Sequence, residues 1–150
     1  MRPAVHTAAS GLVSIVFAYW TKSWPGTLAC FLSGIFIDLD HVLDYWLARK
    51  RLLFTYKELF YFCAKEKEGK LYLVLHSYEF IALFWFMVYY YQWPVVWLGA
   101  AVGVSVHIFL DQLDNPIRPW VYFLCYRFRH GFVREFIFSE EYYKKLPDDS

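Results

Sequence analysis

Four stretches of mostly apolar residues dominate the chain and set its predicted architecture. They cover roughly residues 7–20, 27–47, 71–91 and 93–110. A helix that crosses a bilayer needs about 20 mostly apolar residues, so each stretch is a candidate for one crossing. Turn signals that contain proline separate the first stretch from the second and the third from the fourth. The pattern predicts an all-α polytopic membrane protein, in which four transmembrane helices form a bundle over about residues 6–114.

Two more polar segments lie outside these stretches. The first, from Arg49 to Lys70, mixes seven Lys or Arg with apolar residues such as Leu52 and Phe60. Such a mixture is typical of an amphipathic helix on a membrane surface, and we predict one over about residues 50–66. The second, about residues 117–150, begins as a basic, aromatic segment, which is typical of an interfacial helix or a cytoplasmic helix packed on the bundle. All 150 residues are expected to form a single membrane domain.

Composition favours a membrane protein over a soluble one. Hydrophobic residues make up 59% of the chain and aromatic residues 23%, whereas charged residues fall to 19%. A soluble domain of this size has too little interior to hide so much apolar surface. The net charge of +1 gives no reason to expect a nucleic acid as partner. Membrane lipids are the expected partners, and no protein partner is indicated.

The basic residues are unevenly distributed between the two sides of the predicted bundle. Of 15 Lys and Arg, only Lys22 falls on the side opposite to the termini. Cytoplasmic segments of membrane proteins carry an excess of Lys and Arg. We therefore expect an integral membrane protein with both termini in the cytoplasm.

Histidine and acidic residues concentrate where the predicted helices reach the cytoplasmic side. In chain order, these residues are His6, Asp38, Asp40, His41, Asp44, His76, Glu79, His107, Asp111 and Asp114. Ionisable residues inside membrane segments are costly and mark functional sites. Because the four helices alternate in direction, we expect these side chains to gather at one depth.

The spacing of these residues places several of them on common helix faces. Asp38 and His41 are three residues apart, and His107 and Asp111 are four apart, so each pair projects to one side of its helix. Helix bundles hold metal ions with such pairs of histidine and carboxylate. The alternative is a structural network of hydrogen bonds without a metal. The predicted ligands are His6, Asp38, His41, His76, His107 and Asp111, and the candidate general bases are Asp40 and Glu79.

Two further features bear on the predicted metal site. Nitrogen and oxygen ligands suit Zn²⁺, with Mn²⁺ and Fe²⁺ as alternatives. Gly99 and Gly103 form a GxxxG pattern, which lets a neighbouring helix backbone come close. Steps of four residues from these glycines lead to His107 and Asp111. The packing face of the fourth helix is therefore predicted to continue into its polar face.

The order of these motifs resembles a known family. The motifs are His6-Thr7, Asp38-x-Asp40-His41, His76-Ser77 and His107-x3-Asp111. They are similar to those of the predicted membrane-bound metal-dependent hydrolases of bacteria, a family described as distantly similar to zinc-dependent phospholipase C. The family commonly has His-Arg-Gly-x-Thr before its His-Ser, whereas this chain has residues 71–75, Leu-Tyr-Leu-Val-Leu.

The resemblance implies a metal-dependent hydrolase at the cytoplasmic face of the bacterial inner membrane. A phosphoester or a lipid headgroup is the expected substrate class, since the predicted site lies at headgroup depth. Two other classes of function remain open from the residues alone. One is a non-catalytic membrane scaffold or regulator with a structural polar or metal cluster, and the other is a carrier of divalent cations.

Overall fold

The computed structural model describes residues 3–51, 53–66, 69–114 and 117–138, and every regular element within these ranges is a helix. The elements are α1 (Pro3–Thr21), α2 (Trp24–Phe36), α3 (Leu39–Arg49), α4 (Tyr56–Phe60), the π-helix η1 (Tyr61–Lys65), α5 (Tyr78–Tyr90), α6 (Val95–Asp114), the 3₁₀-helix η2 (Pro119–Tyr122), α7 (Leu124–Arg129) and α8 (Arg134–Ile137). The prediction of an all-α protein is thereby confirmed for the described residues.

The chain divides into two compact units, which are described separately. The first unit comprises residues 1–38 and 75–115 and contains α1, α2, α5 and α6. The second comprises residues 39–74 and 116–150 and contains the remaining helices. The prediction of a single membrane domain over the whole chain stays a prediction.

Within the described residues, three stretches of helix are long and apolar enough to cross a membrane. They are Ala4–Thr21, Trp24–Arg49 and Val95–Leu113, with 18, 26 and 19 residues. Within the second stretch α2 ends at Phe36, and a turn at Ile37 and Asp38 precedes α3. The predicted third crossing differs most, because its helix α5 begins at Tyr78 instead of Leu71 and has 13 residues. At 1.5 Å per residue α5 extends over about 20 Å, less than the bilayer core of about 30 Å.

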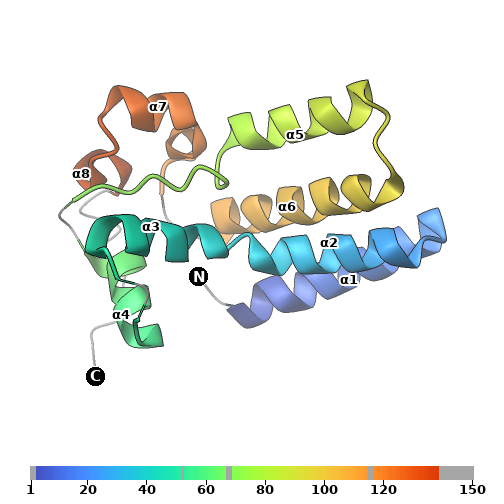
Figure 1. Cartoon of the computed structure of the whole chain (residues 1–150), viewed down its shortest axis with the longest axis horizontal. Helices are drawn as coiled ribbons and strands as arrows, with labels where there is room; N and C mark the ends of the chain where they lie inside the picture. The colour runs from blue at the N-terminus through green and yellow to red at the C-terminus, as the bar shows by residue number, and fades with distance from the viewer. Residues whose placement is uncertain (1–2, 52, 67–68, 115–116, 139–150) are drawn as a thin grey trace. The chain divides into compact units, whose positions relative to one another are not determined.

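The helices of the first unit run side by side, as Figure 1 shows. The α1–α2 and α5–α6 connections lie at the same end of this unit. Large aromatic side chains are exposed around both connections, among them Tyr19, Trp20 and Trp24 on one and Tyr89 and Tyr90 on the other. Exposed Trp and Tyr at one level are typical of the membrane–water interface.

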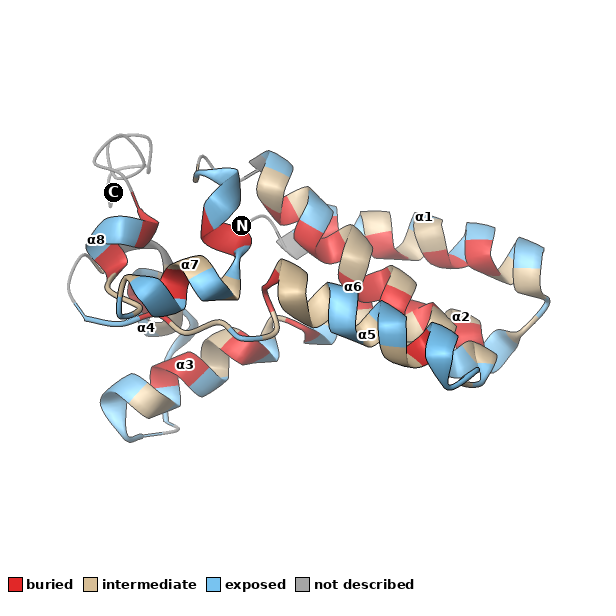
Figure 2. Ribbon diagram, turned by 90° about the horizontal axis from the view of Figure 1, so that it is seen from above, coloured by how far each residue is buried: buried red, intermediate tan, exposed pale blue. Residues whose placement is uncertain are grey.

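Small residues allow α6 to pack closely against α2. A Cβ atom added to Gly99 would collide with the backbone carbonyl group of Gly26, and one added to Gly103 would collide with the carbonyl oxygen of Cys30. Ser33 adds a hydrogen bond across this contact, because its hydroxyl group donates to the carbonyl oxygen of Ala100 at 3.0 Å. In Figure 2 the buried residues of α6 follow the faces that meet its neighbours within this unit. The GxxxG glycines therefore lie at a helix–helix contact.

The second unit has a hydrophobic core of its own. The buried core residues are Tyr45, Phe62, Leu71, Val121, Ile137 and Phe138. They come from α3, η1, the segment after Gly69 and the C-terminal helices, so residues far apart in the sequence share one core. Over residues 50–66, where the sequence predicts one surface helix, the structure has the short α4 followed by η1. Phe62 of η1 is 2% exposed, and it points into this core instead of outward.

Buried charged side chains bind the backbone of the second unit. One carboxylate oxygen of Asp44 accepts hydrogen bonds from the backbone N–H groups of Tyr72, at 2.8 Å, and Leu73, at 3.2 Å. Arg127 donates to the carbonyl oxygens of the same two residues. Arg134, fully buried, donates to the carbonyl oxygen of Phe62 at 2.6 Å. The hydrogen bonds of the two arginines connect residues 62–73 with the C-terminal helices α7 and α8.

A local signal explains where α4 begins. Thr55 and Glu58 form a capping box, in which each side chain binds the backbone N–H of the other residue. The hydrogen bond from the Thr55 backbone N–H holds the pKa of the Glu58 carboxyl group below its ordinary value.

We expect Gly99→Ala to destabilise the packing of the first unit. The added methyl group meets backbone atoms of Gly26, which cannot rotate away, so the cost is about 1–3 kcal/mol of unfolding free energy. Thermal unfolding of the detergent-purified protein, followed by circular dichroism, measures the change. Gly11→Ala is the matched control, since a Cβ there approaches only the Phe31 ring, at 4.0 Å. Equal melting temperatures for the two variants would contradict the proposed close packing.

Candidate metal centre

Histidine and aspartate side chains meet at the end of the first unit opposite to the aromatic connections. His6 lies in α1, Asp38 lies two residues after the end of α2, and His76 lies two residues before the start of α5. His107 and Asp111, four residues apart on one face of α6, complete the cluster. His76 stays outside its helix because Ser77 is the N-cap of α5 and accepts a hydrogen bond from the backbone N–H of Phe80. Four chain segments thus supply five side chains.

The distances between four of these side chains are similar. His76 Nε2 lies 3.6 Å from Asp38 Oδ1 and 3.7 Å from Asp111 Oδ2. His107 Nε2 lies 3.4 Å from each of the same two oxygen atoms. Ligands about 2.0–2.2 Å from a tetrahedral zinc ion are separated by about 3.3–3.6 Å. These four nitrogen–oxygen separations are compatible with side chains that bind an ion.

Direct hydrogen bonds explain these distances less well. A charge-assisted hydrogen bond between nitrogen and a carboxylate oxygen spans about 2.7–2.9 Å. All four separations exceed that range, although these side chains are closely packed. The spacing matches atoms that surround a common centre better than atoms that share a proton.

A hydrogen bond fixes which nitrogen of His107 faces the cluster. His107 Nδ1 lies 2.7 Å from the carbonyl oxygen of Gly34. A carbonyl oxygen can only accept, so Nδ1 carries the proton and Nε2 of the neutral ring presents its lone pair. Metal-binding histidines commonly donate their second N–H to a carbonyl group in this way. Sequence reasoning missed the role of Gly34, because a backbone carbonyl leaves no signal in a residue pattern.

His6 adds a fifth side chain to the cluster. Its Nε2 lies 3.4 Å from Asp111 Oδ1, and its ring lies 4.4 Å from the ring of His107. Among the described residues, neither ring nitrogen of His6 has a hydrogen-bond partner. Burying polar atoms without partners is costly, so an ion that they bind would stabilise this arrangement. His6 is therefore a possible ligand together with His107 and Asp111.

The described residues contain two overlapping groups that could hold a metal ion. One is His6, His107 and Asp111, and the other is Asp38, His76 and His107. Both groups use His107, whose Nδ1 is already engaged with Gly34. An ion bound at Nε2 of His107 could therefore use the other two residues of either group.

Burial of the five side chains is uneven. His6, His76, His107 and Asp111 are at most 4% exposed, whereas the side chain of Asp38 is 38% exposed. The Oδ1 atom of Asp38, which faces His76 and His107, is nevertheless buried, so the exposure belongs to the rest of this side chain. A catalytic metal site needs one coordination position that water or substrate can reach.

The structure does not test the roles of the other predicted site residues. Asp40 and His41 belong to α3 in the second unit, and neither group of described residues that could hold an ion includes them. Glu79 is half-buried in the first turn of α5. Ligand binding by His41 and base catalysis by Asp40 or Glu79 stay predictions. The Asp114 side chain is outside the described part of the chain.

Comparison with known proteins adds no relative. No protein-family model, no curated protein and no solved structure matches the chain. The resemblance to the membrane-bound metal-dependent hydrolases stays an expectation, and the functional argument depends on the centre itself.

We expect the purified protein to bind one divalent ion and the variants His107→Ala and Asp111→Ala to bind it more than about 100-fold more weakly. Removal of even an outer partner of a metal ligand costs roughly 10–100-fold in affinity, and a ligand costs more. Elemental analysis after dialysis, and titration of the stripped protein with Zn²⁺, Mn²⁺ and Fe²⁺, measure the effect.

His130→Ala is the control for this comparison. His130 is in the second unit, where its Nδ1 lies 2.8 Å from the carbonyl oxygen of Tyr126. Metal content that falls equally in this variant, or that stays complete in Asp111→Ala, would rule out the proposed ligand set.

Proposed function

We propose that the chain is a metal-dependent hydrolase of a bacterial inner membrane that cleaves a phosphoester or another ester at the cytoplasmic face. One observation carries the proposal: five histidine and aspartate side chains form two overlapping groups of possible metal ligands, and four of the five are buried. Buried ligands would hold an ion firmly, and the partly exposed Asp38 side chain is where water and substrate would approach.

The membrane location is supported by helices that are long and apolar enough to cross a bilayer. The distribution of basic residues favours cytoplasmic termini, because 14 of the 15 Lys and Arg would then lie inside. The metal centre includes His6, near the N-terminus, and would accordingly lie in the cytoplasmic half. At that depth the exposed part of the Asp38 side chain would meet lipid headgroups, which makes a lipid phosphoester a suitable substrate.

The residues of the centre take separate roles in this proposal. His76 and His107 supply nitrogen ligands, and Asp38 and Asp111 supply oxygen ligands. A bound divalent ion lowers the pKa of a coordinated water to about 7 and polarises the ester that is attacked. Asp111 also faces His6 with its second oxygen atom, Oδ1, so it can orient the His6 ring towards an ion bound by the other ligands. Gly34 holds the His107 ring in the tautomer that can bind.

A second candidate function is that of a non-catalytic membrane scaffold whose polar cluster stabilises the bundle. Burial favours this alternative, because four of the five side chains are almost inaccessible. Structural zinc sites are closed, whereas catalytic sites keep an open position. An open coordination position is therefore the feature that would separate the two candidates.

We expect the metal-loaded protein to hydrolyse at least one member of a panel of short-chain phospholipids and phosphate esters. His76→Ala should reduce kcat/KM by more than about 100-fold, because loss of a ligand removes the stabilisation of charge in the transition state. Release of phosphate or alcohol, measured in detergent at several metal concentrations, gives the rates.

Two variants make the result specific. Asp38→Asn keeps the size of the side chain but weakens its binding to a cation, so activity should fall and partly return at higher metal concentration. His130→Ala should leave the rate unchanged. A protein that retains its metal in full and hydrolyses nothing in the panel would instead support the scaffold.

A further inference from the structure

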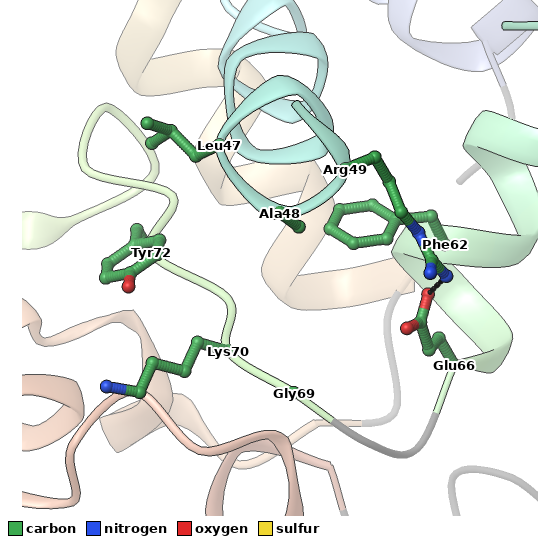
Figure 3. A pocket seen from close by; sticks show the side chains of 8 residues that line it. All are labelled: Leu47, Ala48, Arg49, Phe62, Glu66, Gly69, Lys70 and Tyr72. Carbon is green, nitrogen blue, oxygen red and sulfur yellow. Dashed lines mark hydrogen bonds and ion pairs between the residues drawn. The ribbon is translucent and has the colours of Figure 1, made fainter. Parts of the chain in front are cut away.

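The second unit contains a cavity of about 300 Å³ that the proposed hydrolase does not use. Its walls come from the last turns of α3, from η1 and from the segment that follows Gly69 (Figure 3). None of the five residues of the metal centre lines it. Its volume is at the lower end of small-molecule sites, which range from about 300 to 1,000 Å³.

The polar residues of the lining carry excess positive charge. Arg49 and Glu66, which lie beside Phe62 in Figure 3, neutralise each other through an ion pair of 2.8 Å, drawn there as a dashed line. Lys70 has no ion-pair partner among the described residues, so its ammonium group leaves the lining with a net charge of +1. Tyr72, two residues further on, lies on the same side of the cavity as Lys70 in Figure 3 and adds a hydroxyl group. This side suits an anion that also accepts hydrogen bonds.

The rest of the lining is apolar. Its residues are Leu47 and Ala48 of α3 and the ring of Phe62. The guanidinium group of Arg134 already lies over that ring at 4.4 Å, and that of Arg49 lies at 6.0 Å, so a further cation is disfavoured there. A free inorganic anion would leave the apolar wall unused. A molecule with an anionic group and a short apolar part fits both sides.

We propose that this cavity binds the phosphate group of an amphiphile, with the phosphate beside Lys70 and Tyr72 and the adjoining carbon chain along Leu47 and Ala48. A volume of about 300 Å³ accommodates a headgroup and its first carbon atoms, and the rest of a lipid chain would extend outside. The proposal is independent of metal binding and of hydrolysis.

The test is titration of the full-length, detergent-purified protein with dihexanoyl phosphatidylglycerol, below its micelle concentration, by isothermal calorimetry. EDTA is present throughout, so that no ion in the metal centre contributes to binding. We expect saturable binding that Lys70→Gln weakens roughly tenfold, or about 1.4 kcal/mol of binding free energy, because a hydrogen bond to a charged group is lost. Ala48→Phe should weaken it at least as much, because the ring fills the space of the carbon chain.

Lys57→Gln is the matched control, since Lys57 is an exposed lysine of the same unit that does not line the cavity. It should leave the affinity unchanged. A parallel titration with inorganic phosphate separates the two sources of the anion, and binding at least tenfold weaker than that of the lipid is expected. Absent lipid binding, equal binding of inorganic phosphate, or equal weakening by Lys57→Gln would overturn the proposal.

Discussion

The close approach of α6 to α2 is the contact on which the metal centre depends. Gly99 and Gly103 have no side chain to separate the two backbones, and the polar face of α6 begins one turn after Gly103. At this separation His107 reaches the carbonyl oxygen of Gly34, and Asp38, four residues beyond Gly34, reaches His107. A larger residue at either glycine would move α6 outward and lengthen both contacts. Helix packing therefore sets the ligand geometry.

Because the cluster is buried, the charges of its side chains must be balanced. Four ionisable side chains are almost inaccessible in a unit whose surface is largely apolar, and an uncompensated charge there is costly. Two carboxylates and three imidazoles can balance their charges either with a divalent ion or with protonated histidines. The separations of 3.4–3.7 Å favour the ion, because shared protons would draw the same atoms closer.

Much of the centre could be predicted from the sequence, because helix periodicity determines which residues share a face. The pair of His107 and Asp111 and its continuation from the GxxxG glycines follow from spacing alone. The shared face of Asp38 and His41 is predicted for one continuous helix, whereas in the structure α2 ends at Phe36 and α3 begins after the turn. Apolar character continues through that turn, so hydropathy gives no sign of the break. The core of the second unit was also missed, since it joins segments separated by many residues.

The late start of α5 shows what a hydropathy pattern leaves out. Residues 71–75 are apolar enough to begin a membrane helix, yet Leu73 has a φ of +44°, which a helix cannot contain. Such a conformation costs of order 1–3 kcal/mol and needs compensation from its surroundings. Asp44 accepts the backbone N–H of Leu73, and Arg127 donates to its carbonyl group, so both of its backbone polar groups are satisfied outside any helix. These partners lie 29 and 54 positions away in the chain. No local pattern can reveal them, and the helix begins only where Ser77 provides a cap.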